Sequence, residues 1–281
     1  MKITAHVLVK NEDRFLWYSV MSVIDYVDRL LLWDTGSSDK TVAIIDELIN
    51  DPRTKGKIAP KYFRDDSFFD EQDLRQQMLD ATYGDWFIVI DGDEIWWQSS
   101  MALVVNTIKQ VGSSIESIVV PTINMVGDMF HRQEERAGHY KLAGRIGHYN
   151  LRAINLNIPG LHSTKPHGLW GWADLDGRMI QDRNPEKVIF LDAPYLHASF
   201  LQRSSLTGKS TKVYKRAFKY KHEIGDQLVS DFFYPEAFFL IRPRMAPFVF
   251  GSMPINFKLR AMIETPLRKI KRRLLSSKVG Y

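Results

Sequence analysis

Apolar residues in the first ninety positions follow two alternating spacings. Mostly apolar runs predict buried strands at ITAHVLV (3–9), LLLW (30–33), KYF (61–63) and WFIVI (86–90). Between them, apolar residues recur at helical spacing at Leu16, Val20, Val23 and Val27, at Val42, Ile45 and Ile49, and, behind an Asp70 N-cap, at Leu74, Met78 and Ala81. Strands and helices that alternate with short connections predict an α/β fold, with a mostly parallel sheet wound right-handedly and flanked by helices.

The pattern becomes less regular after Glu94. It predicts a helix near 100–111, a strand at SIVVPTI (117–123) and another at KVIFL (187–191), with a Gly- and His-rich stretch between the two strands. We interpret this half as α+β material built onto the same sheet, and we predict one domain because no Pro/Gly/Ser-rich linker divides the chain. The predicted units are a nucleotide-binding half (1–95) and an acceptor half (96–250), which together form the domain 1–250, and a C-terminal tail (251–281).

Composition excludes several classes of protein. The 281 residues are 44% apolar and 25% charged, which is ordinary for a globular protein. The chain has no cysteine, so disulfides, zinc–thiolate sites and thiol nucleophiles are excluded. The N-terminus does not read as a signal peptide, and no run approaches the roughly 20 apolar residues of a membrane span. We therefore expect a cytoplasmic protein that does not cross a membrane.

The net charge of +5 is concentrated in the tail. Residues 258–281 hold eight basic residues and one acid, Glu264, so the tail carries +7 and residues 1–257 carry −2. After Pro266, a narrow apolar stripe lies among basic residues; the stripe is Leu267, Ile270 and Leu274, and the basic residues are Arg268, Lys269, Lys271, Arg272 and Arg273. This pattern predicts a basic amphipathic helix on an anionic membrane surface, which would make the protein peripheral to the inner face of the membrane. The alternative is a helix that packs its stripe on the domain.

Polar residues follow three of the predicted strands. The first strand ends at Lys10, Asn11 and Glu12, the second at Asp34, and the fourth at the stretch DGDE (91–94). In an open parallel sheet, ligands bind beyond the carboxyl ends of the strands. The stretch DTGSSDKT (34–41) also has a purely structural interpretation, because glycine permits a tight turn and serine or aspartate caps the next helix.

Asp91, Asp93 and Glu94 place three carboxylates directly after a buried strand. Carboxylates packed this closely repel one another, and their pKa values rise unless a cation lies between them. Mg²⁺ or Mn²⁺ would resolve the conflict, because both prefer oxygen ligands. The alternative is that Asp91 caps a turn while Asp93 and Glu94 are solvated.

Three segments in register resemble the nucleotide-sugar-dependent glycosyltransferases of family two, which have the GT-A fold. They are VKNEDRFLWYSVMSV (9–23), WDTGSSDKT (33–41) and LRQQMLDATYGDWFIVIDGDE (74–94). Gln76 departs from the family, which often has asparagine there. The resemblance implies Mn²⁺ or Mg²⁺ as cofactor, with Asp93, Asp91 and His197 of YLHASF (195–200) as ligands. It implies donor contacts from Val9, Lys10, Asn11, Glu12, Asp34, Arg75, Asp91 and Gly92.

The resemblance also implies the reaction. A sugar would move, with inversion at its anomeric carbon, from a nucleoside diphosphate sugar, with UDP-sugars favoured, to a glycan or lipid-linked envelope acceptor. A base must take the proton of the acceptor hydroxyl, and we predict Asp174 or Asp176 for this role; an Asp-Gly turn that uses Asp176 for geometry alone is the alternative. Lys212 lies in a basic stretch that could close over the diphosphate or simply be a solvated helix face.

Two other functions fit parts of the pattern. A nucleotidyltransferase also brings a nucleotide and a carboxylate-bound metal to a parallel sheet, but VKNEDRF is not the Gly-rich, basic loop that such an enzyme ordinarily has. A non-catalytic protein could use the tail to bind membrane or nucleic acid. We expect no nucleic-acid partner, and the sequence leaves the oligomeric state open.

Overall fold

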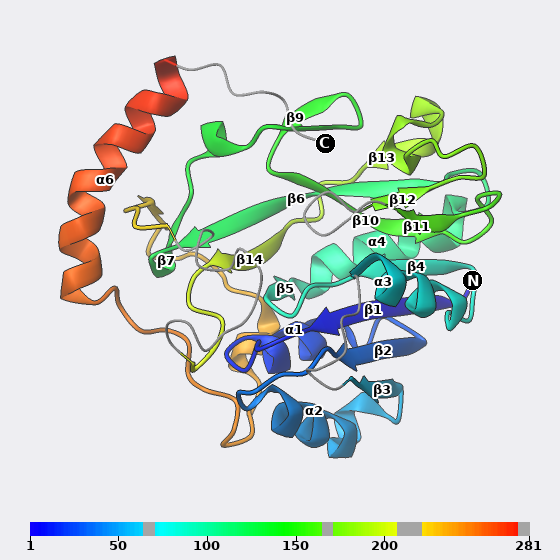
Figure 1. The fold of residues 1–281 in the computed structure, drawn as a ribbon, viewed down its shortest axis with the longest axis horizontal. Coiled ribbons are helices and arrows are strands. Elements are labelled where there is room, and N and C mark those ends of the chain that lie inside the picture. Colours follow the sequence, from blue (N-terminus) through cyan, green and yellow to red (C-terminus); the bar gives the residue numbers. More distant parts are fainter. Residues whose placement is uncertain (64–70, 165–170, 207–220, 275–281) are drawn as a thin grey trace.

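A computed structural model describes residues 1–63, 71–164, 171–206 and 221–274, and Figure 1 shows their arrangement. Four parallel strands of the first half lie in the order β4-β1-β2-β3. The strands are β1 (Ile3–Val9), β2 (Arg29–Asp34), β3 (Ile58–Tyr62) and β4 (Trp86–Val89). Three helices and a short 3-10 turn connect them: α1 (Leu16–Val23), α2 (Thr41–Asn50), η1 (Pro52–Thr54) and α3 (Glu71–Asp80). The predicted α/β fold is confirmed, and the predicted Asp70 cap lies outside the described residues.

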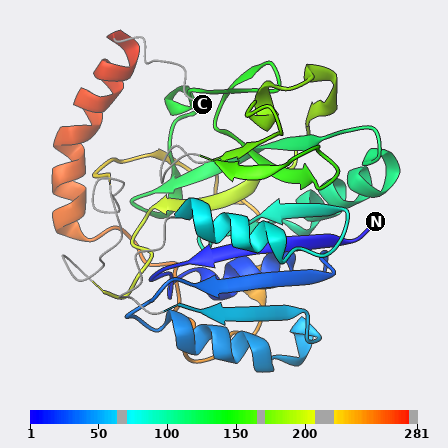
Figure 2. The ribbon, with the colours of Figure 1, turned by 45° about the vertical axis from the view of Figure 1, so that its right-hand side comes forward.

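Alternating side chains of the strands pack on two layers. Leu30 and Leu32 belong to the main core with residues of α1 and α2, whereas Leu31 and Trp33 pack with Met78 of α3. This alternation is what a strand buried on both faces requires. Helices α1, α2 and α4 (Gln98–Val111) therefore cover one face of the sheet, and α3 covers the other (Figure 2).

The second half extends the same sheet beyond β4. Strand β10 (Tyr149–Asn155) lies between β4 and β6 (Ser117–Val126) and is antiparallel to both. Five further strands join this sheet: β5 (Glu94–Trp96), β7 (Asp128–Arg132), β13 (Val188–Phe190), β14 (Tyr195–Phe200) and β15 (Asp226–Gln227). Two hairpins form separate two-stranded sheets: β8–β9 (Tyr140–Leu142, Arg145–Gly147) and β11–β12 (His162–Thr164, Gly171–Ala173). The short 3-10 turns are η2 (Glu135–Ala137), η3 (Ile180–Asp182), η4 (Pro185–Lys187) and η6 (Glu236–Phe239). The interpretation of this half as part of one sheet is confirmed, although the stretch read as irregular contains strands.

The C-terminal part of the chain returns to the first half before it ends in a helix. The Tyr18 hydroxyl donates to the Pro247 carbonyl at 2.9 Å, and the indole of Trp97 donates to the Phe233 carbonyl at 3.0 Å. Helix α6 then runs over Ile255–Leu274 with Pro266 inside it. The sequence placed the start of this helix after Pro266, so the helix is about three turns longer than predicted. No helix within the described ranges is long and apolar enough to span a bilayer.

Candidate active site

The loops after β1 and β2 are fastened together at one edge of the sheet. Val9 and Asp34 are paired in register, so both strands end at the same level. The Asn11 side chain accepts a hydrogen bond from the Ser38 amide at 2.7 Å, and the Asn11 amide donates to the Ser37 hydroxyl at 2.7 Å. Asn11 adopts a left-handed conformation, with φ of 56°, which asparagine tolerates better than most residues. The loop containing Lys10, Asn11 and Glu12 therefore has a defined shape before any ligand binds.

Asp34 shapes its own turn. Its carboxylate accepts from the amides of Gly36, at 3.0 Å, and Ser37, at 2.9 Å, and also from the Ser37 hydroxyl. Gly36 has φ of 87°, where a side chain would be strained. The tight turn of the structural interpretation is thus observed, whereas α2 has Lys40 at its N-cap and no side-chain cap. The role of Asp34 toward a nucleoside stays a prediction.

The turn 91–94 packs directly on the end of β1. A side chain at Gly92 would place its Cβ 2.9 Å from Cγ1 of Val9 and 3.1 Å from Cγ of Glu12. Glycine is required for this close approach, because a Cβ at these distances would displace the turn or the strand. The carboxylates of Asp91 and Asp93 consequently reach the edge at which β1 and β2 end.

Asp93 is fully buried beside an arginine and a histidine. Its Oδ2 lies 2.9 Å from Nη1 of Arg203 and 3.5 Å from Nε2 of His197. Burial alone would raise the pKa of Asp93, but Arg203 and His197 outweigh it and hold that pKa well below its ordinary value. Oδ1 of Asp93 has no hydrogen-bond partner within the described part of the chain. A buried carboxylate oxygen in that condition is suited to receive a ligand.

Arg203 owes its position to backbone contacts that the sequence did not reveal. The Arg14 amide donates to the Arg203 carbonyl at 3.1 Å, and the Ser205 amide donates to Oδ1 of Asp13 at 2.7 Å. These contacts hold the segment after β14 against the loop after β1, and Nη1 of Arg203 lies 3.3 Å from Oε1 of Glu12. The sequence suggested a solvated helix face or a lid for this basic stretch, whereas Arg203 is a buried counterion of Asp93.

Asp91 lies between two other arginines. Its Oδ1 is 3.6 Å from Nη2 of Arg75, on α3, and its Oδ2 is 3.4 Å from Nη2 of Arg152, on β10. Burial would raise the pKa of Asp91, but the guanidinium groups of Arg152 and Arg75 lower it overall. The side chain of Asp91 is 34% exposed, so it remains accessible from solvent.

Glu94 is as enclosed as Asp93. It is fully buried and forms an ion pair with Arg152, whose Nε in turn donates to the Tyr195 hydroxyl at 3.1 Å. Burial, with the nearby Asp91 and Asp93, raises the pKa of Glu94 despite that ion pair. From the sequence we expect a metal ion to neutralise the carboxylates. In the structure, positive charge also comes from Arg75, Arg152 and Arg203, which belong to three separate parts of the chain. Arg152 was missed because its strand, YNLRAIN, lies in the stretch read as irregular.

A divalent metal nevertheless fits part of this group. Asp91, Glu94 and His197 each offer one ligand atom, and these atoms lie within 4.8 Å of one another. Register explains the convergence, because His197 of β14 pairs with Glu94 of β5. Carboxylate oxygens with one imidazole suit Mn²⁺, and oxygen donors suit Mg²⁺. The geometric set therefore includes two of the predicted ligands, Asp91 and His197, and adds Glu94, while Asp93 adjoins it through His197.

The predicted base residues lie elsewhere in the fold. Oδ1 of Asp174 accepts from the amides of Asp176, at 3.1 Å, and Arg178, at 2.9 Å, and its Oδ2 is paired with Arg183. Arg183 also pairs with Glu116, at 2.7 Å, immediately before β6. The start of β6 is level with the start of β4, whereas Asp91 follows the end of β4. Figure 1 shows β12, which precedes Asp174, at the end of the sheet near the N-terminus, so the structure does not bring Asp174 and Asp176 to the acidic group.

Lys212, predicted to contact the donor, lies outside the described residues.

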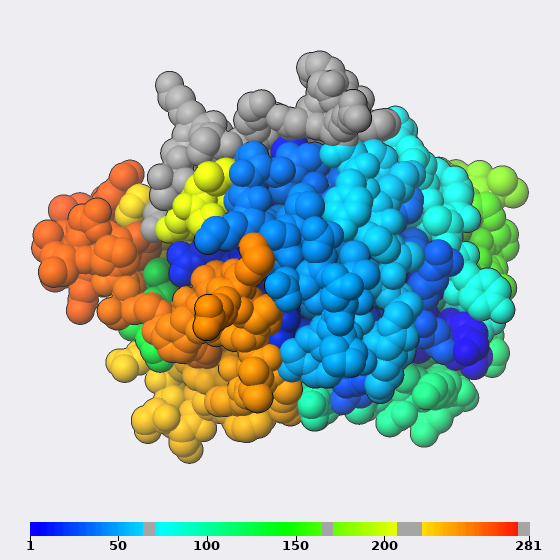
Figure 3. Space-filling model, turned by 90° about the horizontal axis from the view of Figure 1, so that it is seen from below, coloured from blue at the N-terminus to red at the C-terminus, as the bar shows by residue number. Residues whose placement is uncertain are grey.

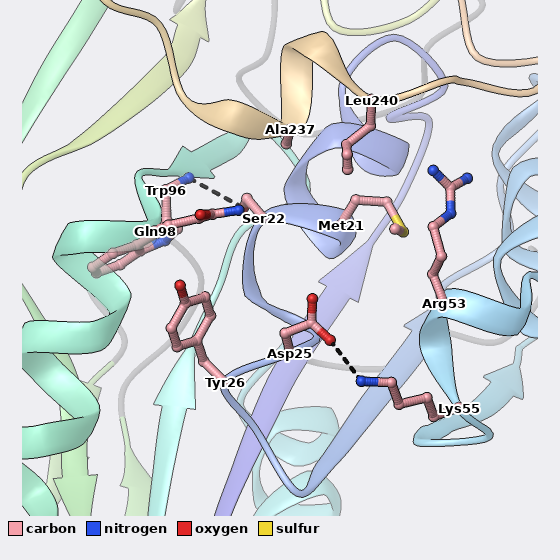
Figure 4. Close-up of a pocket in the computed structure, with 10 residues that line it drawn as sticks. All are labelled: Met21, Ser22, Asp25, Tyr26, Arg53, Lys55, Trp96, Gln98, Ala237 and Leu240. Carbon is pink, nitrogen blue, oxygen red and sulfur yellow. Dashed lines mark hydrogen bonds and ion pairs between the residues drawn. The ribbon is translucent and has the colours of Figure 1, made fainter.

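A cavity of about 430 Å³ lies beside α1, between η1, β5 and η6 (Figure 4). Its charged residues are already paired, with Asp25 and Lys55 3.1 Å apart. None of the predicted site residues that the structure describes lines this cavity, so we place the site at the sheet edge instead.

Comparison with known proteins identifies the family. The sequence model described as Glycosyl transferase family 2 matches residues 4–165, more than half of the chain. A TPR repeat-containing protein of Synechococcus elongatus is 33% identical over 93 residues, which are 33% of this chain and 21% of that protein. The chain thus spans about a fifth of the length of this curated relative.

Solved structures with a similar arrangement are more distant. TarS of S. aureus (residues 1–349) aligns with a TM-score of 0.45 and 12% identity, over 71% of this chain and 61% of that chain. Glucosyl-3-phosphoglycerate synthase of Mycobacterium tuberculosis, in a complex with Mn²⁺, UDP-glucose and phosphoglyceric acid, aligns with a TM-score of 0.46 and 15% identity, over 70% and 72%. At these scores the likeness does not bear on substrate or mechanism.

Proposed function

The chain belongs to glycosyl transferase family 2, with its GT-A fold and nucleotide-sugar donors, and we propose that it moves a sugar from a UDP-sugar to a hydroxyl of a glycan or lipid-linked acceptor. The observation that supports this proposal is the meeting of Asp91, Asp93 and His197 at the edge where β1 and β2 end. Family membership favours glycosyl transfer over the nucleotidyltransferase and the non-catalytic alternatives.

The two parts of the edge suit the two parts of a donor. The loops fastened by Asn11 and Asp34 form a rigid place for the nucleoside, since ligands bind outside the carboxyl ends of parallel strands. The turn 91–94 adjoins them through Gly92 and would face the diphosphate. Asp91, Glu94 and His197, with Asp93 beside them, would hold Mn²⁺ or Mg²⁺. When bound, such a metal supplies Lewis acidity to the departing diphosphate.

Arg203 has a separate part in this proposal. Its guanidinium stays charged, because the neighbouring Asp93 and Glu12 raise its pKa although burial lowers it. A fixed positive charge beside the diphosphate favours the negative charge that develops as the sugar leaves. Arg203 also keeps Asp93 ionised and its Oδ2 in place.

Inversion at the anomeric carbon is part of the proposal and needs one base opposite the leaving group. Asp174 and Asp176 were predicted for this step, but Asp174 is engaged with Arg183 and two backbone amides at the other end of the sheet. We therefore assign the base to neither residue.

The test is release of free nucleotide from UDP-, GDP-, dTDP- and CMP-linked sugars with Mn²⁺, with EDTA, and in the variants Asp93→Ala and Asp174→Ala. We expect turnover of a UDP-sugar that requires the metal, is lost in Asp93→Ala and persists in Asp174→Ala. Turnover that is indifferent to EDTA and to Asp93→Ala would overturn the proposal, as would the absence of turnover and binding for every donor.

A further inference from the structure

Helix α6 carries a continuous apolar face that points away from the domain. Seven apolar residues gather on one side of it by helical position and are all more than half exposed. They are Ile255, Leu259, Met262, Ile263, Leu267, Ile270 and Leu274. Over 20 residues the helix is about 30 Å long, so this face is a long strip of exposed apolar surface. Soluble monomers rarely leave such a patch uncovered unless it binds something.

The opposite face already attaches the helix to the domain. Phe257, Ala261 and Thr265 are buried, and they follow one another at intervals of four along one side of the helix. The Ile224 amide donates to the Thr265 hydroxyl at 2.8 Å, and Arg272 pairs with Glu223 at 2.5 Å and with Glu134 at 3.0 Å. The stripe predicted from the sequence, Leu267, Ile270 and Leu274, therefore does not pack on the domain, because a different face does.

Basic residues border the outward apolar face. Lys258 and Lys269 lie along one side of it, Lys271 along the other, and Arg273 near its C-terminal end, by helical position. Glu264 is the one acid within α6, and it pairs with Arg260 at 2.6 Å and with Arg268 at 2.8 Å. The outward side of the helix is thus apolar along its middle and cationic at its borders.

We propose that this face of α6 docks on an anionic lipid bilayer, with its apolar residues among the acyl chains and its lysines at the headgroups. A second copy of the chain fits less well, because two such faces would bring lysine and arginine borders together with no acid to pair them. Figures 1 and 3 show α6 at one end of the molecule, and in Figure 1 this is the side toward which β1 runs. Docking here would bring the candidate active site near the membrane, where a lipid-linked acceptor would be found.

The experiment measures flotation of the full chain with vesicles of phosphatidylcholine alone and with vesicles that also contain the anionic lipid phosphatidylglycerol. The double variant Leu259→Ser with Ile263→Ser removes apolar surface without disturbing the buried face. We expect it to bind anionic vesicles at least about tenfold more weakly than the wild type. The pair Lys258→Gln with Lys271→Gln should weaken the preference for anionic lipid and the sensitivity to salt, because it removes two of the four border cations.

The matched control is Ile146→Ser with Leu175→Ser, which replaces two exposed apolar residues far from α6 in the chain. It should bind vesicles like the wild type, and melting curves and donor turnover in solution should be alike for all variants. Because donor turnover needs no membrane, failure of vesicle binding and failure of the proposed function would be seen separately.

Two results would overturn the proposal. One is equal vesicle binding by the wild type and Leu259→Ser with Ile263→Ser, or no binding by either. The other is a dimer of the wild type, seen by light scattering, that this same double variant dissociates while vesicles bind neither form, since that would make a second copy the occupant of the face.

Discussion

Two stretches of this chain read Asp-X-Asp, and the structure uses them differently. Asp91-Gly92-Asp93 follows a buried parallel strand, and its carboxylates meet Arg75, Arg152, Arg203 and His197. Asp174-Leu175-Asp176 lies in a turn at the opposite end of the sheet, where backbone amides and Arg183 occupy Asp174 and where Asp176 is exposed. The residue between the two aspartates differs in its surroundings. Gly92 lies in close contact with the end of β1, whereas the side chain of Leu175 is 77% exposed.

The comparison shows that a lowered pKa does not by itself distinguish the two aspartates. Burial would raise the pKa values of both Asp93 and Asp174, yet nearby donors and guanidinium groups lower both. What distinguishes Asp93 is an oxygen without a partner among the described residues, together with two more acids and an imidazole beside it. The four predictions that follow test this difference, from the largest expected effect to the smallest.

Replacing the two aspartates should separate them most clearly. Asp93→Asn should lower kcat/KM on the order of 10³-fold, because it removes a carboxylate that the proposal places beside the metal that would bind the diphosphate. Asp174→Asn should leave kcat/KM within about threefold of the wild type, since the asparagine oxygen can still accept from the turn amides. Steady-state kinetics with the donor found in the panel measure both, and a larger loss in Asp174→Asn would reverse the comparison.

Removing the arginine of each group should affect stability unequally. Arg203→Met leaves the buried Asp93 without its closest cation and should cost about 3–5 kcal/mol in the free energy of unfolding. Arg183→Met breaks more exposed pairs with Glu116 and Asp174 and should cost about 1 kcal/mol. Urea unfolding of both variants provides the values, and equal losses would mean that burial does not distinguish the two groups.

The middle residue of each stretch should show a smaller difference. Gly92→Ala places a methyl group against Val9 and Glu12 and should cost about 1–3 kcal/mol, with a fall in kcat/KM as the turn shifts. Leu175→Ala changes an exposed side chain and should alter stability by less than about 0.5 kcal/mol. Thermal unfolding and kinetics check both variants. Unchanged kinetics in Gly92→Ala would show that the turn tolerates displacement.

The dependence of folding stability on pH should distinguish the contribution of the carboxylates from that of His6, a buried histidine in β1. Burial, with Arg75 nearby, lowers the pKa of His6 to about 3. As pH falls below about 6.5, the unfolded chain takes up a proton that folded His6 does not, so stability should fall by up to about 1.4 kcal/mol per pH unit. His6→Gln should make this slope shallower between pH 6.5 and 4, leaving the parts contributed by His148 and His222, whose pKa values burial also lowers.

The pKa of Asp93 is also lowered in the folded protein, but from an ordinary value of about 4, so it acts in a more acidic range than His6. Its stabilising contribution is present above about pH 4 and is lost only as pH falls further, so Asp93→Asn should leave the slope between pH 6.5 and 4 intact. Urea unfolding at several pH values tests both variants. If the slope of stability against pH is unchanged in His6→Gln, that slope belongs to other titratable groups.

Much of the fold could be predicted because its signals are local. The runs at 3–9, 30–33 and 86–90 are buried on both faces and therefore read as strands, and the short connections between them imply a parallel sheet. Pairing between distant segments has no such local signal. The antiparallel strand β10, placed between β4 and β6, was for this reason not predicted.

The candidate site was predictable to the same extent. The polar residues Asn11, Asp34 and Asp91 could be found because each lies just after a predicted strand, and the register of the parallel strands places them at one edge of the sheet. Arg152 and Arg203 could not, since each comes from a stretch without clear periodicity and reaches the acids only through the fold. The acid cluster signalled that a cation was needed, but the sequence could not show that arginines would supply part of it.

The most direct test of the central claim is nucleotide binding by calorimetry with Mn²⁺ present, using the nucleoside diphosphate of the donor that the panel identifies. The account predicts that the wild type and Asp174→Asn bind it with similar affinity, and that Asp93→Asn binds it at least about tenfold more weakly. Equal affinity in Asp93→Asn, or loss of binding in Asp174→Asn alone, would contradict the assignment of the donor to the edge formed by β1, β2 and the turn 91–94.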